Sequence, residues 1–368
     1  MQRCVKALMI LTRYLIKEVL TTLLAVTFVL LLIFLSNWLV RYLDYAASGK
    51  IASGIVLQLL GFEIPSLLAV LLPLGLFLGV ILAYGRLYSE SEMRVMHACG
   101  FTLSRLFLVT SYLAITVAVG VLIFMLWINP WVAAKKEKVL TNNGAGNVLA
   151  ILMPGRFQSV SDGRRVVYVE KMSRDRKQAT NIFMADQVGT TLDESSKWVV
   201  LSASKGYQQV DPATQDRFIV AEDGARYEGV PGQNDYKIVQ FKKYAVKMPE
   251  TATTSSRAKT ESIPTQKLLE TYHNPENAAE LQWRISIALS AILLGLLAVP
   301  LSQVKPRKSR YSMVLPAILV YAVYVNLLFA ARNLVEQQII SVTIGMWWVH
   351  LIVLGLLGLF LLTGRRTV

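Results

Sequence analysis

Long apolar runs alternate with short polar stretches along most of this 368-residue chain. Six runs are long enough to cross a bilayer, because a hydrocarbon core of about 30 Å requires a helix of about 20 residues. They cover residues 19–40, 64–85, 106–129, 285–304, 311–331 and 339–364. The apolar stretch 51–62 extends the second run, with Glu63 and Pro65 between the two. The pattern predicts a membrane α-helical protein with six transmembrane helices, three on each side of a long polar insert.

The insert has a different pattern, typical of β structure. Short runs rich in Val, Ile, Tyr and Phe predict strands at 165–169, 181–185, 198–202, 217–221 and 236–241. Turn signals stand at 161–163, 211–212, 222–224 and 231–232. A sandwich, a jellyroll and an open barrel-like domain all fit this spacing. Residues 249–264 predict a linker back to the membrane, followed by a short helix at 265–272. The predicted domains are 1–134, 135–264 and 265–368.

Composition and charge agree with a membrane protein and give it an orientation. Hydrophobic residues make up 54% of the chain and charged residues 17%. Basic residues collect at both ends, at 86–105 and at 305–310, whereas the opposite short loops hold Arg41, Lys50 and Arg332. Positive residues are retained on the cytoplasmic side, so both termini are expected there and the insert outside. We attribute the net charge of +14 to basic residues that set the membrane topology and face anionic lipid head groups, and not to nucleic-acid binding.

The sequence contains no recognisable catalytic constellation. It lacks the GxxxxGK[ST] phosphate loop and the HExxH and GxSxG motifs. Cys4 and Cys99 fall on the predicted cytoplasmic side, where no disulfide is expected. The three histidines have no metal-ligand spacing. We therefore expect no catalytic residue, cofactor or metal in this chain. Acids within the membrane are limited to Glu63, at an expected bend where the second run begins, which disfavours a proton-driven carrier.

The polar segment 86–100, RLYSESEMRVMHACG, interrupts the apolar pattern on the cytoplasmic side. Ser89 and Glu92 have the spacing of a capping box, and Gly100 is suited to end the helix in the left-handed conformation. Met93 and Met96 share one helix face that suits an irregular partner surface. Glu92 and Glu90 are explained equally by helix capping and by docking to an arginine on a soluble partner.

Several stretches resemble one known family. The opening RYLIKEVL, the run LPLGLFLGVILAYGRLYSESEMRVMHACG, the later ELQWRI, and PLS followed by LPAIL are similar to the lipopolysaccharide-export permease family LptF/LptG. The resemblance covers the whole chain, including three spans on each side of a β-insert. SESEMRVMHACG is closer to the F-type members than to the G-type.

The resemblance implies an ATP-driven exporter that extracts lipopolysaccharide from the inner membrane and passes it to a periplasmic bridge. The expected partners are an LptG-like permease subunit, a dimer of cytoplasmic LptB-like subunits that use the ATP, and an LptC-like single-span jellyroll protein. The insert would be a periplasmic jellyroll. Residues 86–100 would be the coupling helix, with Glu90, Glu92, Met93 and Met96 at the ATPase.

Three arginines follow as candidates for contact with lipopolysaccharide phosphates. By position at predicted outer helix ends, Arg41 and Arg332 match basic positions of the family, and Arg suits bidentate phosphate contact. Interfacial anchoring is the alternative for both. Arg284 is a third candidate, paired with Glu280 if that stretch is helical. Trp38 stands where family members can have a basic residue.

Two alternatives stay open at this point. One is the paralogous G-type subunit of the same transporter. The other is a non-transporting envelope sensor or scaffold, whose β-domain binds an outer ligand and whose cytoplasmic helix relays the signal. Lipid extraction from vesicles with ATP would distinguish a transporter from a sensor.

Overall fold

The computed structural model describes residues 2–47, 51, 53–140, 154–160, 165–173, 178–188, 197–210, 217–233, 235–247, 260–303 and 312–364. The chain divides into two compact units. One contains Met1–Trp38, Leu60–Lys135 and Ser256–Val368, and the other contains Leu39–Leu59 and Lys136–Ser255. We call them the helical unit and the sheet unit, and each is described by itself.

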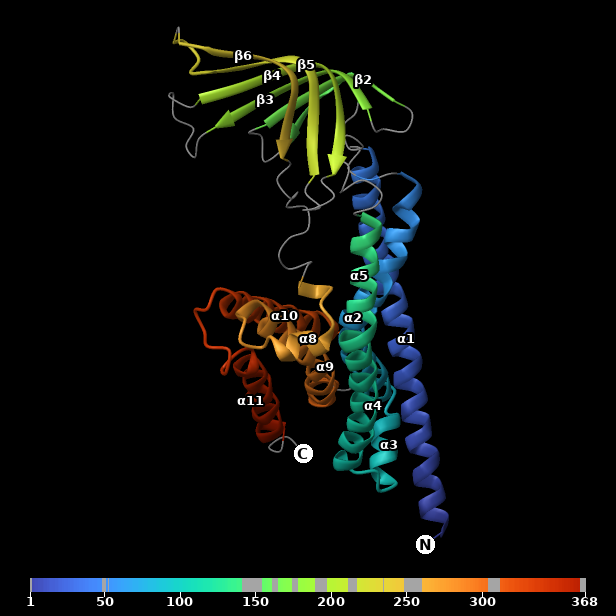
Figure 1. Ribbon diagram of the computed structural model, residues 1–368. Helices are drawn as coiled ribbons and strands as arrows, with labels where there is room; N and C mark the ends of the chain where they lie inside the picture. The colour runs from blue at the N-terminus through green and yellow to red at the C-terminus, as the bar shows by residue number, and fades with distance from the viewer. Residues whose placement is uncertain are drawn as a thin grey trace. The chain divides into compact units, whose positions relative to one another are not determined.

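Long apolar helices account for most of the first unit (Figure 1). The helices before the insert are α1 (Gln2–Ala47), α2 (Val56–Ser89), α3 (Glu92–Ala98), α4 (Leu103–Ile123), the π-helix η2 (Phe124–Ile128) and α5 (Asn129–Leu140), and a 3₁₀ turn, η1 (Ser53–Ile55), precedes α2. Their residues 39–59 and 136–140 belong to the sheet unit. The helices after the insert are α8 (Thr265–Glu270), α9 (Pro275–Leu301), α10 (Val314–Glu336) and α11 (Trp347–Gly364). The apolar stretch before Glu63 belongs to the same helix as the second run, as expected, because α2 continues through Glu63 and Pro65.

The predicted spans are confirmed as apolar helices. Among the described residues, five helical segments are long and apolar enough to cross a membrane: Met9–Ala47, Ser53–Ser89, Leu103–Leu140, Pro275–Leu301 and Val314–Glu336. The sixth predicted span contains the shorter apolar segment Trp347–Leu362. Its helix begins later than the hydropathy pattern predicted, because residues 337–346 form turns and bends instead of a helical start. The chain is therefore a multi-pass membrane protein.

Close packing of α1 against α2 depends on two glycines. A Cβ at Gly79 would lie 3.1 Å from the Leu23 backbone, and one at Gly75 would lie 2.0 Å from Thr27 Oγ1. Small residues four apart let two membrane helices approach closely. On α1, the buried side chains that the structure describes in the helical unit form one stripe with a period of four residues: Leu15, Val19, Leu23 and Thr27. The rest of α1 is largely exposed.

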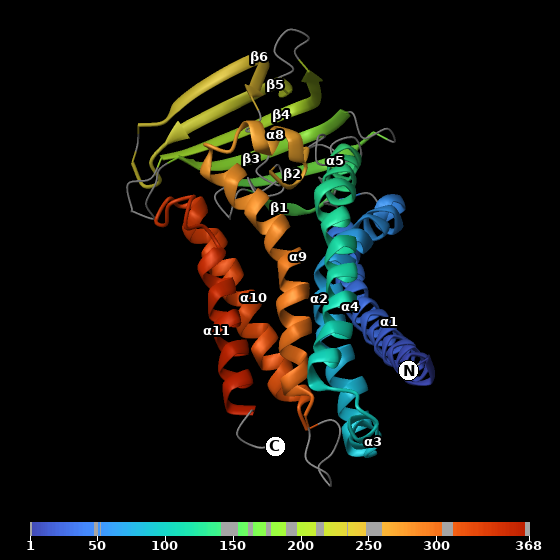
Figure 2. The ribbon, with the colours of Figure 1, turned by 90° about the horizontal axis from the view of Figure 1, so that it is seen from below.

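Helix α9 occupies the middle of the helical unit, with α4 on one side and α10 and α11 on the other (Figure 2). Its side chains between Ala278 and Val299 are mostly buried. Many of these buried side chains are polar, which is unusual for a membrane helix and marks α9 as the centre of a hydrogen-bonded network.

The sheet unit is antiparallel, as the strand predictions required. Its described strands are β1 (Phe157–Val160), β2 (Arg165–Met172), β3 (Gln178–Val188), β4 (Lys197–Val210), β5 (Arg217–Gly229) and β6 (Lys237–Lys247). Sequential strands are neighbours throughout, in the order β1-β2-β3-β4-β5-β6. The all-β insert is thus confirmed. Among the described strands, this order is a meander without the Greek-key crossover that defines a jellyroll.

A single transverse row interrupts the strand pairing from β2 to β6. In each of the four strand pairs, one residue pair is missing from the register. The missing pairs are Glu170–Asn181, Asn181–Ser204, Ser204–Asp223 and Asp223–Lys242. Asn181 and Asp223 have φ values of 52° and 51°, in the left-handed region that Asn and Asp tolerate best among residues with a side chain. We call the residues of these missing pairs the crease row. The long strands change direction along their length (Figure 1).

The crease row explains one wrong prediction. The turn expected at 222–224 lies inside β5, because Asp223 takes up the left-handed conformation while the strand continues on both sides. The turn at 231–232 is confirmed, with Gly232 at φ 88°. The helix expected at 265–272 is confirmed as α8. Predictions for 161–163, 211–212, 249–259, 305–310 and 365–366, and for Lys50, lie outside the described residues.

Candidate functional site

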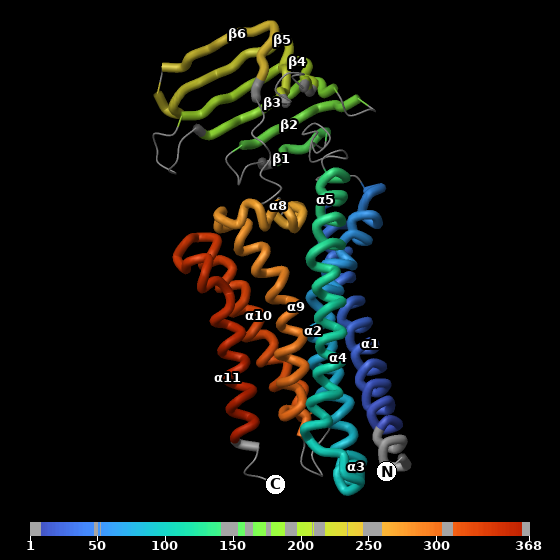
Figure 3. The backbone as a smooth tube through the Cα atoms, turned by 60° about the horizontal axis from the view of Figure 1, so that its bottom comes forward, coloured from blue at the N-terminus to red at the C-terminus, as the bar shows by residue number. Residues whose placement is uncertain are grey.

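The predicted coupling segment contains the end of α2 and the short helix α3, which lies beside the N-terminal part of α1 (Figure 3). Helix α3 spans seven residues, Glu92–Ala98. Gly100 has φ 87° and follows the helix, as predicted. The capping box is wrong. Ser89 belongs to α2, where its hydroxyl donates to the Arg86 carbonyl, and Ser91, at φ 65°, takes the N-cap position without a side-chain cap.

The two methionines of this segment face inward. Met93 and Met96 belong to the core of the helical unit, where they are 0% and 6% exposed. They therefore anchor α3 to its own bundle, in place of the outward face we expected. The reason is that two apolar side chains three residues apart on a helix form an apolar face, which here is buried in the core of the helical unit. Glu90 and Val95 remain exposed.

Glu92 is held by a polar network that joins α1, α2 and α3. The Tyr14 hydroxyl donates to Glu92 Oε2 at 2.9 Å. Arg86 Nη2 donates to the Tyr14 hydroxyl at 3.3 Å and pairs with Glu18 Oε1 at 3.1 Å. We call these four residues the Tyr14 network. Sequence reasoning missed Tyr14 and Glu18, since 78 residues separate Tyr14 from Glu92.

The structure brings two of the three predicted phosphate ligands together. Arg284 Nε bonds to Glu280 Oε1 at 2.8 Å, which confirms the expected pair, and Arg332 Nη2 bonds to Glu280 Oε2 at 2.7 Å. Arg332 Nε also pairs with Glu336 at 2.8 Å. The side chains of Glu280, Arg284 and Arg332 are 4%, 2% and 3% exposed. We call these four residues the Glu280 cluster.

The Glu280 cluster has equal numbers of acids and bases. Each guanidinium is therefore paired with a carboxylate inside the protein, and a phosphate at Arg332 would compete with Glu280 and Glu336. Arg332 also lies over the Trp283 ring, 5.3 Å from its centroid. Arg41, by contrast, is exposed near the end of α1 and belongs to the sheet unit.

Arg284 also holds the segment that enters α8. Its Nη2 donates to the carbonyls of Glu261 and Ile263, both at 3.1 Å, and its Nη1 donates to Thr265 Oγ1 at 2.9 Å. The Thr265 hydroxyl in turn donates to the Leu126 carbonyl of η2 at 2.6 Å. A π-helix frees such carbonyls from the regular ladder and is frequent at functional sites.

Two further polar groups of the α9–α11 region are buried and satisfied. Gln282 Nε2 donates to the Val342 carbonyl at 2.7 Å, and its Oε1 accepts from the Met346 amide at 3.2 Å. His350 lies between the Tyr324 hydroxyl at 2.6 Å and Ser286 Oγ at 3.0 Å. These contacts connect three helices, and nothing in the local sequence pattern indicated them.

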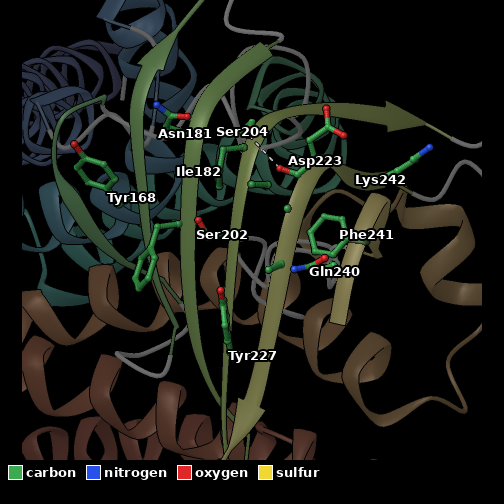
Figure 4. Close-up of a pocket in the computed structure, with 14 residues that line it drawn as sticks. Tyr168, Asn181, Ile182, Ser202, Ser204, Asp223, Tyr227, Gln240, Phe241 and Lys242 are labelled. Carbon is green, nitrogen blue, oxygen red and sulfur yellow. Dashed lines mark hydrogen bonds between the residues drawn. The ribbon is translucent and has the colours of Figure 1, made fainter. Parts of the chain in front are cut away.

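The sheet unit has an open hollow of about 750 Å³ at the crease row. Figure 4 shows Asn181, Ser204, Asp223 and Lys242 around it, with the hydrogen bond from Ser204 Oγ to the Asp223 carbonyl dashed. Aromatic side chains also line the hollow: Tyr168, Phe183, Tyr227 and Phe241. Its volume is in the usual range of ligand sites, about 300–1,000 Å³.

The family model described as "Lipopolysaccharide export system permease LptF/LptG" matches residues 13–363. The lipopolysaccharide export system permease protein LptF of Escherichia coli K12 is 33% identical over 348 residues, which cover 95% of this chain and 93% of that protein. LptF of Shigella flexneri matches with the same figures. The LptG permease protein of Escherichia coli K12 is 28% identical over 178 residues, or 46% of each chain.

Proposed function

Because this chain belongs to the lipopolysaccharide export permease family LptF/LptG, we propose that it is the F-type permease subunit of an ATP-driven exporter. In this function it extracts lipopolysaccharide from the inner membrane and passes it toward the outer membrane. The observation that carries the proposal is the match to LptF along 95% of the chain. The shorter match to LptG, over 46% of the chain, favours the F-type assignment.

The proposed assembly contains an LptG-like permease, a dimer of cytoplasmic LptB-like ATP-binding subunits, an LptC-like protein and the periplasmic bridge. Both termini lie in the cytoplasm and the sheet unit in the periplasm, as the distribution of basic residues favours. ATP is bound and hydrolysed by the partner subunits. The sheet unit receives lipopolysaccharide and passes it on, and the hollow at the crease row is its candidate contact surface.

Helix α3 is the proposed docking element for the ATPase. Its support is the combination of a short helix between two spans with an acid, Glu90, whose side chain is exposed. Glu92 stays a prediction for the same interface. Met93 and Met96 contribute by fixing the helix to the bundle, since they are buried.

Reversing the charge of Glu90 tests the docking proposal. We expect Glu90→Arg to weaken binding of the ATP-binding subunits by about tenfold or more, because a charge-assisted contact is replaced by repulsion. The matched control is Glu270→Arg on α8, which reverses another exposed acid. Co-purification and a binding titration in nanodiscs measure the effect. Full recovery of the ATPase with Glu90→Arg would refute docking through Glu90.

Arg41 is the proposed first contact for a lipopolysaccharide phosphate, since its guanidinium is on an exposed position of α1. Arg332 and Arg284 stay predictions, because both are engaged in the Glu280 cluster. A photo-crosslinker at Val40, 65% exposed, is expected to capture lipopolysaccharide, as is one at Asn333. The control position is Leu108 on α4, 69% exposed. Labelling equal to that control would count against the site.

A further inference from the structure

We propose that Tyr14 is a positioning residue that couples movement of α3 to α1, so that the two helices move together during the transport cycle. The inference rests on the proposed function, in which α3 docks on the ATPase. It adds the path by which displacement of α3 reaches the long first helix.

The contacts of Glu92 are the first step of the argument. Its carboxylate accepts the Tyr14 hydroxyl at 2.9 Å and thus points toward α1. Arg86, at the end of α2, donates to the same hydroxyl and pairs with Glu18 one turn further along α1. Within the Tyr14 network, Tyr14 is therefore the residue of α1 that contacts both of the other helices. It bonds to α3 through Glu92 and to α2 through Arg86.

The attachment of α1 to the bundle is the second step. Its described buried stripe in the helical unit begins at Leu15, beside Tyr14, and ends at Thr27. Gly79 brings the α2 backbone against Leu23 within this stripe. Beyond it, α1 continues as one unbroken helix to Ala47 with mostly exposed side chains. Because α1 is one continuous helix from the Tyr14 network to Ala47, a displacement at Tyr14 is passed to the rest of α1 through its backbone hydrogen bonds.

The anchoring of α3 is the third step. Met93 and Met96 bury the apolar face of α3 in the core of the helical unit, so the helix is anchored to its own bundle. Among the hydrogen bonds described between α1 and α3, the Tyr14–Glu92 bond is the direct one. Hydrogen bonds to a charged group are stronger than neutral ones and are specific in direction, which suits a joint that must transmit displacement.

The test separates this role from docking by two conservative variants. Tyr14→Phe removes the hydroxyl and keeps the ring, leaving the Glu92 charge available to a partner. Glu92→Gln removes that charge but keeps an oxygen that accepts from Tyr14. The matched control is Tyr112→Phe on α4, where Tyr112 is 66% exposed. Each variant is reconstituted with its partner subunits, and lipopolysaccharide released per ATP hydrolysed is measured.

We expect Tyr14→Phe to retain the ATPase at wild-type stoichiometry and to lower the lipopolysaccharide released per ATP by about tenfold, the effect of losing one hydrogen bond to a charged group. Tyr112→Phe is expected to keep the wild-type ratio, and Glu92→Gln, which keeps a neutral acceptor for the Tyr14 hydroxyl, is expected to lower the ratio less than Tyr14→Phe does. A wild-type ratio in Tyr14→Phe would overturn the proposal. A lowered ratio of lipopolysaccharide released per ATP in Glu92→Gln, together with a wild-type ratio in Tyr14→Phe, would assign Glu92 to the partner interface instead. Failure of docking itself is detected separately, by Glu90→Arg.

A distance measurement tests the joint without transport. Spin labels at Leu24 on α1 and Val95 on α3, 59% and 63% exposed, are introduced with Cys4 and Cys99 replaced by Ser. In the complex, we expect their separation to stay constant when a non-hydrolysable ATP analogue is added, and to change in Tyr14→Phe. An identical distance distribution in the two proteins, with and without nucleotide, would overturn the joint.

Discussion

Removing the Glu280 carboxylate is the most informative perturbation of the helical unit. Glu280→Ala deletes the acceptor of two contacts, to Arg284 at 2.8 Å and to Arg332 at 2.7 Å, in a site where all three side chains are at most 4% exposed. Breaking a buried ion pair by deleting one partner costs about 3–5 kcal/mol, because an uncompensated charge is left in the interior.

Because both arginines keep other contacts in Glu280→Ala, we expect the loss of stability to be at the lower end of the range for a broken buried ion pair. Arg284 keeps Thr265 and the carbonyls of Glu261 and Ile263. Arg332 keeps Glu336 and the face of Trp283. We therefore expect a loss of about 3 kcal/mol in the free energy of unfolding, or a Tm lower by about 6–12 °C at about 2–4 °C per kcal/mol.

Thermal unfolding of the purified full chain in nanodiscs, followed by intrinsic fluorescence, measures this loss. The matched control is Glu276→Ala, one turn earlier on α9 and exposed. That variant loses an acid in the first turn of a helix, with an expected cost of about 0.3–1 kcal/mol. Equal shifts in Tm for Glu280→Ala and Glu276→Ala would refute the interpretation of the Glu280 cluster as a buried, coupled group.

Two further outcomes follow from close packing and from charge. Gly79→Leu is expected to force α1 away from the Leu23 contact and to destabilise the chain by about 1–3 kcal/mol, whereas Gly120→Leu, where a Cβ meets no atom within 4 Å, has little effect on the same thermal assay. In the sheet unit, the hydrogen bond with Lys243 lowers the pKa of Glu222, and the same bond raises the pKa of Lys243. The contribution of Glu222 to stability is therefore present above the usual carboxyl pKa and is lost as the pH falls through the lowered pKa of Glu222. The contribution of Lys243 is lost as the pH rises through the raised pKa of Lys243. Titration of ¹³C-labelled Glu222 by NMR should show its pKa rising when Lys243 is replaced in Lys243→Met, and an unchanged titration would contradict the pairing.

The sequence predicted those features that depend on local pattern. Hydropathy and length located the membrane helices, because each span must satisfy its backbone hydrogen bonds internally. Short runs rich in Val, Ile, Tyr and Phe located five strands. The pair Glu280–Arg284 was also accessible, since four residues on a helix place two side chains on one face.

The remaining features depend on tertiary contacts that no local pattern encodes. Arg332 shares Glu280 across 52 residues of chain. The predicted capping box at Ser89 is wrong because α2 continues past its expected end. Ser89 therefore belongs to α2 and cannot be the N-cap of α3. Gly75 and Gly79 are a different case. Their spacing of four residues is a local pattern that by itself indicates close helix packing.

The crease row has a consequence for how the insert can change its length. Five strands of 8 to 14 residues place one residue each in the same row, from Glu170 to Lys242. A residue inserted within one strand would move its neighbour out of the row and displace the left-handed positions at Asn181 and Asp223 from their partners. Insertions and deletions inside the strands are thus constrained jointly across the whole sheet, and length variation among related proteins should be confined to the loops between strands.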